Sequence, residues 1–154
     1  MADRADAIQL WEPAYTILMS RKPEMRRLDD GAAASWKAFT GGSTRIPYLG
    51  VAAHQDWIAQ NKALIPRLYK AYQKAAEWLK ANPDAAASLI TPKATPADLK
   101  ALADSIRAND RLSLNLSPAG EVRKEIESVY RAGIDLKFLP KMPSEASIYS
   151  GSMK

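Results

Sequence analysis

Residues 64–84 read LIPRLYKAYQKAAEWLKANPD, and this stretch decides most of the fold class. Leucine, alanine and aromatic side chains recur every three or four positions, which predicts a long amphipathic helix over residues 64–81. Pro66 must lie in the first turn of that helix, where its missing N–H breaks no hydrogen bond. Asn82 and Pro83 predict that a new helix begins directly afterwards, with Asn82 as its cap and Pro83 as its first residue.

Similar boundary signals occur elsewhere in the chain. Thr95 and Ser117 are each followed by proline, a combination typical of a helix start, and an apolar stripe follows each of them. Pro13 suits the first turn of an earlier helix, and Gly133 is expected to close the last one. The tail from residue 134 is expected to be mostly irregular. The expected helices cover residues 13–23, 55–60, 64–81, 96–107 and 118–132, with a further one from Pro83.

Short apolar runs predict strands in the first third of the chain. Residues 5–11 and 46–53 have the length and composition of buried strands, and Pro47 lies near the start of the second run, where a lost donor is tolerated. Residues 25–29 are a weaker strand candidate, and residues 31–44 are expected to form a loop with at most one helical turn. The order strand–helix–strand–strand, followed by four or five helices, indicates an α/β protein.

The four tryptophans receive different interpretations. Trp57 and Trp78 lie on apolar helix stripes and are expected in the core, where truncating Trp78 would cost roughly 3–5 kcal/mol. Trp36, in a polar region, is expected to be half exposed. Trp11 ends a predicted strand directly before Glu12, a place that can face a ligand cleft in α/β proteins, so core packing and ligand contact are equally consistent with it.

Composition excludes several classes of function. Hydrophobic residues at 47% and charged residues at 25% are ordinary for a globular chain of 154 residues, and no apolar run approaches the ~18 residues of a membrane span. Without cysteine there is no disulfide, thiolate metal site or cysteine nucleophile, and a single histidine, His54, cannot build a multi-histidine metal site. His54 is interpreted as a surface or helix-capping residue. We therefore expect no enzyme, no metal and no cofactor.

The net charge is 22 − 17 = +5. Such a balance permits attraction of anions but says nothing about the fold. The densest basic group, Arg21 to Arg27, is interrupted by Pro23 and Glu24, and no RNA-binding or zinc-finger motif accompanies it. We therefore interpret the basic residues as a solvated surface and expect no nucleic-acid partner.

The segment Asp6-Ala-Ile-Gln-Leu-Trp-Glu-Pro13 resembles the D-A-x-x-x-W-E-P segment of substrate-binding proteins of ABC importers, of the nitrate/sulfonate/taurine type. The similarity continues in the same order over nearly the whole chain, although each motif alone is only moderately specific. The further similar segments are residues 27–29, 48–51, 57–61, 71–78 and 82–86.

The resemblance implies the helix-rich C-terminal half of a two-lobed, periplasmic-binding-protein-like α/β fold of type II. Residues 1–52 would hold second-lobe strands and a crossover strand, and residues 53–154 a helical part that returns to the first lobe. Family members are longer, so we expect the chain to be truncated. A periplasmic location is implied by the resemblance, although the first residues have no features of a signal peptide.

The implied function is the substrate-binding component of an ABC importer for a small solute, with no catalysis. The implied partners are the solute and the membrane permease of the transporter. The two lobes of such proteins close on the ligand, and strand ends and helix N-termini supply the contacts. The residues that the resemblance places at the ligand are Trp11, Glu12, Pro13, Tyr48 and Leu49.

Two alternatives stay open. A thiamine-pyrimidine synthase-like enzyme would have a similar fold, but the cysteine- and histidine-bearing motifs of such enzymes are not in this sequence. A small basic interaction protein would bind nucleic acid in a strongly salt-dependent way.

If the chain is half of a two-lobed binder, its ligand pocket is open on one side and apolar surface is exposed. We then expect it to bind no small solute tightly by itself and to self-associate.

Overall fold

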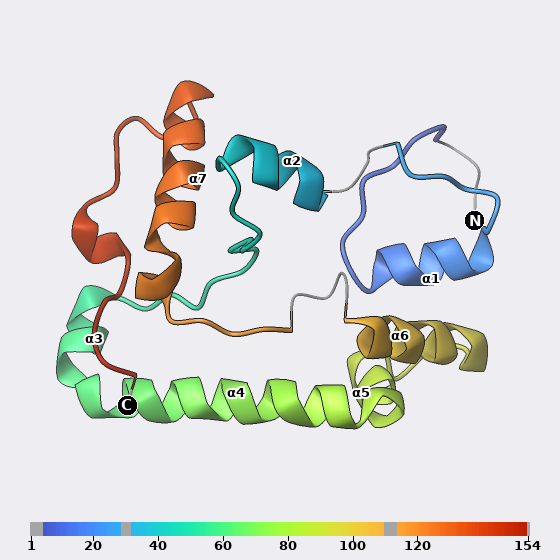
Figure 1. Ribbon diagram of the computed structural model, residues 1–154. Helices are drawn as coiled ribbons and strands as arrows, with labels where there is room; N and C mark the ends of the chain where they lie inside the picture. The colour runs from blue at the N-terminus through green and yellow to red at the C-terminus, as the bar shows by residue number, and fades with distance from the viewer. Residues whose placement is uncertain (1–4, 29–31, 110–113, 154) are drawn as a thin grey trace. The chain divides into compact units, whose positions relative to one another are not determined.

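The computed structural model describes residues 5–28, 32–109 and 114–153 (Figure 1). Within these ranges the chain forms α-helices and short 3-10 turns, and no residue lies in a β-strand. The helices are α1 (Ala14–Arg21), α2 (Ala32–Phe39), α3 (Gln55–Gln60), α4 (Ile65–Ala81), α5 (Pro83–Ile90), α6 (Pro96–Ala108) and α7 (Arg123–Asp135). The 3-10 turns cover Lys62–Leu64, Ala119–Val122 and Glu145–Ser147. The prediction of a helix-rich chain is confirmed.

The predicted strands at residues 5–11 and 46–53 are wrong for this structure. In both segments the backbone is neither helical nor part of a β-ladder. The physical reason is that a strand exists only by pairing, and no described residue provides a partner strand. At the start of the second segment, the Tyr48 N–H donates locally to the Ile46 carbonyl at 2.9 Å, across Pro47, so a γ-turn replaces ladder geometry. Of the weaker candidate, residues 25–28 form no strand and residue 29 lies outside the described residues.

Helix ends follow the sequence signals with two differences. The last helix continues past Gly133 to Asp135, and Lys137 adopts the left-handed conformation (φ 62°) that ends it. A Cβ at Gly133 would lie 3.1 Å from Leu139 Cδ1, so close packing explains this glycine better than helix termination does. Asn82 precedes α5 as predicted, but its side-chain amide donates backwards to the Trp78 carbonyl at 2.9 Å. It therefore stabilises the end of α4 rather than the start of α5.

The chain divides into two compact units. Unit 1 comprises Met1–Arg26 and Lys74–Leu114, and unit 2 comprises Arg27–Gln73 and Asn115–Lys154. Helix α4 contributes residues to both. The predicted division between residues 52 and 53, which rests on a family resemblance, stays a prediction.

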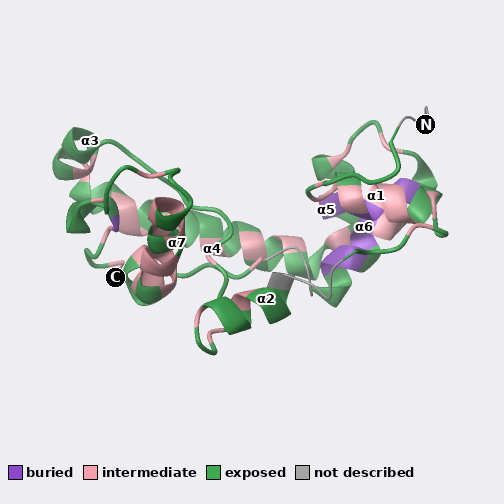
Figure 2. Ribbon diagram, turned by 90° about the horizontal axis from the view of Figure 1, so that it is seen from above, coloured by how far each residue is buried: buried purple, intermediate pink, exposed green. Residues whose placement is uncertain are grey.

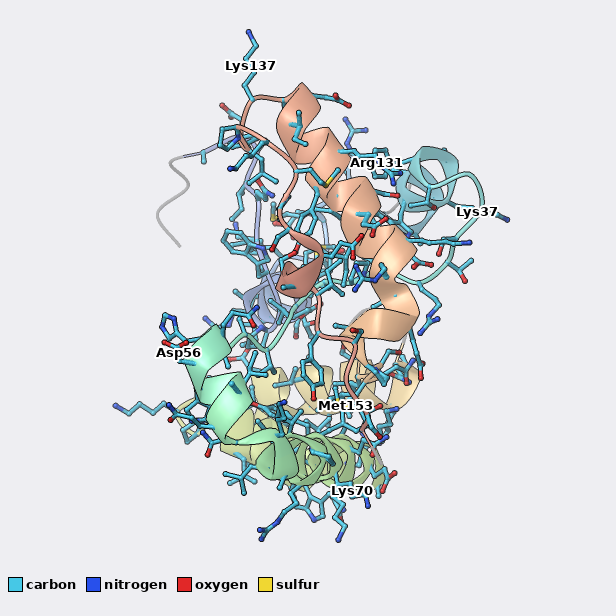
Figure 3. All side chains as sticks on the ribbon, turned by 90° about the vertical axis from the view of Figure 1, so that its left-hand side faces the viewer. Lys37, Asp56, Lys70, Arg131, Lys137 and Met153 are labelled. Atoms are coloured by element: carbon cyan, nitrogen blue, oxygen red, sulfur yellow. The ribbon has the colours of Figure 1, made fainter. Side chains whose placement is uncertain are left out.

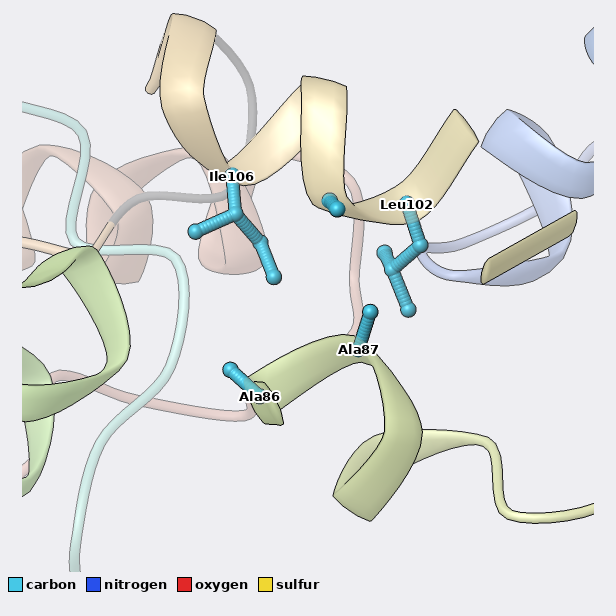
Figure 4. Close-up of a cluster of buried hydrophobic side chains, with 5 residues drawn as sticks. Ala86, Ala87, Leu102 and Ile106 are labelled. Atoms are coloured by element: carbon cyan, nitrogen blue, oxygen red, sulfur yellow. The ribbon is translucent and has the colours of Figure 1, made fainter. Parts of the chain in front are cut away.

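Unit 1 has an apolar core between α5 and α6. Ala86 and Ala87 on α5 face the side chains of Leu102 and Ile106 on α6, and all four are almost completely buried (Figure 4). Because alanine side chains are short, the two helices approach closely enough to exclude water. Ala103 completes the cluster, and Leu79, Leu99 and Leu114 pack around it. Figure 2 shows the buried residues of this unit gathered on α1, α5 and α6.

Unit 2 has little buried surface. Ile148 is its one buried residue among those described, and α3, α4 and α7 contain none. The region from 31 to 44, expected to be mainly loop, contains the two-turn helix α2, in which the rings of Trp36 and Phe39 lie 5.7 Å apart at 50°. Trp36 is half-buried, as expected.

The expectation that Trp57 and Trp78 lie in the core is wrong. Their exposed fractions are 41% and 45%. Their helices have the predicted apolar stripes, but within the described residues no element covers these side chains completely. Truncating Trp78 should therefore cost less than the roughly 3–5 kcal/mol of a buried aromatic residue.

Candidate functional site

The first three predicted site residues lead directly into α1. The Trp11 carbonyl accepts the Tyr15 N–H at 3.0 Å and the Pro13 carbonyl accepts the Ile17 N–H at 3.1 Å, so the backbone before the helix already carries its first hydrogen bonds. Trp11 is 65% exposed, and the Glu12–Pro13 peptide bond is cis. The structure thus presents the Trp11 indole to solvent beside the start of a helix.

Glu12 has a defined role at this helix start. Its Oε2 atom accepts the Thr16 backbone N–H at 3.3 Å. Pro13, at the N-cap position, makes no capping hydrogen bond with its side chain. The first N–H groups of a helix have no partner within the helix, and Glu12 accepts one of them. A carboxylate here also interacts favourably with the positive end of the helix dipole. An anion approaching this helix start would meet a negative charge already in place.

Tyr48 and Leu49 lie in unit 2, whereas Trp11, Glu12 and Pro13 lie in unit 1. Tyr48 is 53% exposed and Leu49 is 87% exposed, and both belong to the segment that forms no strand. The predicted site residues therefore form two sets of sequence neighbours, one in each unit. His54, interpreted as a surface or capping residue, is exposed and takes the N-cap position of α3 without a side-chain hydrogen bond to the helix.

An unpredicted polar cluster occupies unit 1 between α1 and α6. Asp98 is only 1% exposed, yet its carboxylate is fully engaged. Arg21 donates to both of its oxygens, from Nε at 2.9 Å and from a terminal guanidinium nitrogen. The Thr95 hydroxyl donates to Oδ2 at 2.8 Å and the Thr95 N–H to the same oxygen at 3.3 Å, and Thr95 Oγ1 accepts the Asp98 N–H at 3.3 Å. Thr95 and Asp98 thus form a capping box at the start of α6.

This arrangement holds Asp98 ionised. Hydrogen bonds from Arg21, and then from Thr95, lower the pKa of the Asp98 carboxyl well below its usual range against the opposing effect of burial. A carboxylate so firmly ionised cannot act as a general acid near neutral pH and has little tendency to accept a proton. The structure thus shows Asp98 as a link that joins α1 to α6. The spacing of Thr95 and Asp98 was visible in the sequence, but no local signal indicates Arg21, 77 residues away.

Two shallow hollows lie within unit 2. One, of about 580 Å³, is lined by residues of α3, the start of α4 and the C-terminal tail, namely Ile58, Lys62, Ala63, Pro66, Tyr149, Gly151 and Ser152. The other, of about 280 Å³, lies beside Trp36, whose buried Nε1 has no hydrogen-bond partner among the described residues. None of the five predicted site residues lines either hollow.

Within the described ranges no three His, Cys, Asp or Glu side chains group in a way that could hold a metal ion. None of the described helices is long and apolar enough to cross a membrane. Comparison of the chain with protein-family models, with curated proteins and with solved structures gives no match.

Proposed function

We propose that the chain is the C-terminal half of a substrate-binding component of an ABC importer, for a small solute of the nitrate, sulfonate or taurine class. The ordered set of motifs that begins with Asp6-Ala-Ile-Gln-Leu-Trp-Glu-Pro13 supports this assignment. Such a protein would act outside the cytoplasmic membrane, in the periplasm, and deliver its solute to the membrane permease of the transporter. Its α/β fold would need strands, and the described residues of this chain form none.

The observation that carries the proposal is the state of the two apolar segments, residues 5–11 and 46–53. Both lie outside helices and ladders, and both expose large apolar side chains such as Ile8 and Val51. Segments of this kind bury their side chains and satisfy their backbone groups when they are added to a sheet. We infer that further strands of the same protein pair with them.

The proposed ligand contacts are Trp11, Glu12, Pro13, Tyr48 and Leu49. An exposed indole offers a flat apolar surface for the carbon chain of an alkyl sulfonate. The Glu12 carboxylate attracts an ammonium group and repels a simple anion at short range. Taurine carries both an ammonium and a sulfonate group, so within the class it suits this helix start better than nitrate does.

The first test is the coding DNA upstream of codon 1. We expect an in-frame continuation that encodes a signal peptide and the opening strands and helices of a two-lobed protein. The product of that longer frame is then titrated with taurine, an alkyl sulfonate and nitrate by isothermal calorimetry. We expect taurine to bind with a Kd of about 1 μM or tighter, which corresponds to roughly 8 kcal/mol.

Trp11→Ala in that protein should weaken taurine binding about tenfold or more, equivalent to ~1.4 kcal/mol. Trp78→Ala is the matched control, because Trp78 is also a largely exposed tryptophan of unit 1 and is not a proposed contact. A stop codon directly upstream would contradict the proposed truncation. No binding of any of the three solutes, or equal losses in the two variants, would contradict the proposed site.

A further inference from the structure

Two polar contacts hold α1 to α6 within unit 1. Arg21, at the end of α1, pairs with Asp98 near the start of α6. Near the other end of both helices, the Thr16 hydroxyl donates to Ser105 Oγ at 3.5 Å. The two helices therefore run antiparallel and side by side (Figure 1). Thr16 is the one buried residue of α1, and its partner Ser105 is buried as well.

The apolar core of unit 1 does not include α1. The buried cluster joins α5 to α6, and the half-buried side chains packed against it, those of Leu79, Leu99 and Leu114, also lie outside α1. Among the described residues, the attachment of α1 therefore depends on polar contacts more than the attachment of α5 does. Without the Arg21 guanidinium, the buried Asp98 carboxylate would lose its charged partner, and detachment of α1 would expose it to water.

The proposed ligand contacts of unit 1 belong to the hydrogen-bonded start of α1. The Trp11 and Pro13 carbonyls accept N–H groups of this helix, and the Glu12 carboxylate accepts the Thr16 N–H. Residues joined in this way to a short helix move with it. Whatever fixes α1 against α6 therefore also fixes the helix start that carries the Glu12 carboxylate.

We propose that Arg21 and Asp98 are positioning residues, whose ion pair fixes α1, and with it the proposed solute contacts, against the core of unit 1. A ligand binds more tightly to contacts that are already held in place, because less ordering accompanies binding. The effect on solute binding rests on the proposed function, whereas the fixing of α1 does not.

The first experiment is amide hydrogen exchange, followed by NMR, on the chain of 154 residues. Arg21→Met removes the guanidinium group and keeps an apolar side chain in its place. The amide hydrogens of Ile17 and Lys22, which are bonded within α1, should exchange about tenfold faster or more, because α1 opens locally. The amide hydrogens of α5 and α6 should change little, since the apolar cluster still holds these helices together.

Arg107→Met is the matched control. Arg107 pairs with Asp84 of α5, and its side chain is 46% exposed, against 50% for Arg21. Because the apolar cluster also joins α5 to α6, loss of this pair should leave the exchange of both helices close to wild type. Arg21→Met combined with Asp98→Asn is the second variant. It removes the buried charge together with the pair, so the fold is kept and α1 should still exchange faster.

The second experiment titrates the longer protein of the proposed function with taurine, at a temperature where circular dichroism shows full helix content. Arg21→Met should weaken the binding about fivefold or more, because the helix start is no longer held in place. Lys137→Met removes the same charge from an exposed side chain of unit 2, which extends away from the ribbon (Figure 3). This control should bind taurine as the wild type does.

Unchanged exchange of α1 in both Arg21 variants would overturn the proposal. Equal acceleration of α1, α5 and α6 would also overturn it, because the pair would then stabilise unit 1 as a whole. A selective acceleration of α1 with unchanged taurine affinity, or an equal loss of affinity in Lys137→Met, would remove the positioning role. Absence of taurine binding by the wild-type longer protein would contradict the proposed function instead, and the exchange rates would still decide whether the pair fixes α1.

Discussion

Unit 1 and unit 2 contain similar kinds of helix but are held together differently. In unit 1, α6 lies against α5 through five buried apolar residues and is joined to α1 by the Arg21–Asp98 pair. In unit 2, Ile148 is the one buried residue among those described. Short helices are only marginally stable alone and depend on burial of an apolar face. The comparison therefore teaches that helix-forming sequence alone does not determine how much a helix contributes to a stable core.

Polar links take the place of a core in unit 2. Ser43 donates from its hydroxyl to Glu125 Oε1 at 2.8 Å, and Arg45 donates to the Glu121 carbonyl and to the Ser117 hydroxyl, each at 3.1 Å. These links join the segment after α2 to the region around the start of α7. The two hydrogen bonds of Arg45 are exposed, so each should contribute little to stability.

The largest expected effect breaks the core of unit 1. Leu102→Ala should lower the free energy of unfolding by about 2–5 kcal/mol, since it leaves a cavity between α5 and α6. Urea unfolding followed by circular dichroism measures the change. Leu89→Ala, in α5 but with the side chain 72% exposed, is the matched control and should change stability only slightly. Equal losses in both variants would contradict the core described for unit 1.

The next effect concerns Asp98 and pH. Its pKa is lowered in the folded protein, so between this pKa and the unfolded value of about 4 the unfolded chain binds more protons than the folded one. The contribution of Asp98 is therefore present above pH ~4 and is lost as the pH falls further. Asp98→Asn should lower the free energy of unfolding at neutral pH. Below pH ~4 the free energy of unfolding of this variant should fall less steeply with decreasing pH than that of the wild-type chain. Urea midpoints across this range measure both, and parallel curves for the two proteins would contradict the pairing with Arg21.

A smaller effect tests a polar link of unit 2. The hydrogen bond from Ser43 lowers the pKa of the Glu125 carboxyl, so Ser43→Ala should raise that pKa towards its ordinary value. Loss of this one hydrogen bond should cost about 0.5–1.5 kcal/mol. Carbon-detected NMR titration of the carboxyl group measures the pKa. Ser128→Ala is the control, because the Ser128 hydroxyl donates to the Lys124 carbonyl within α7 and should leave the Glu125 titration unchanged.

The smallest effect is expected at the surface of unit 1. Asp104 accepts from Lys100 at 2.6 Å and from Arg107 at 2.8 Å on the exposed side of α6. Solvent screens such pairs strongly, so Asp104→Asn should shift the urea midpoint far less than Asp98→Asn does, and added salt should remove the difference from wild type. A loss as large as that of Asp98→Asn would mean that burial does not distinguish the two carboxylates.

The candidate site was predictable only in part. Proline at 13 and the apolar residues after it indicate a helix start beside Trp11, and α1 begins there. The bond from the Thr16 N–H to Glu12 follows from the geometry of that start. In contrast, nothing local to residues 5–11 or 46–53 shows whether a partner strand is present, and in this structure neither segment forms a strand.

The sequence by itself determined where the helices other than α2 lie, because helix hydrogen bonds join residues four positions apart and caps act within a few residues. Thr95-Pro96 and Asn82-Pro83 specify two helix starts for this reason. Only the tertiary structure decided which apolar stripes are buried, leaving Trp78 exposed while Leu102 is enclosed. It also decided that Asp98 pairs with Arg21. Burial and ion pairing depend on residues far apart along the chain, and strands depend on distant partners in the same way, so no local pattern determines them.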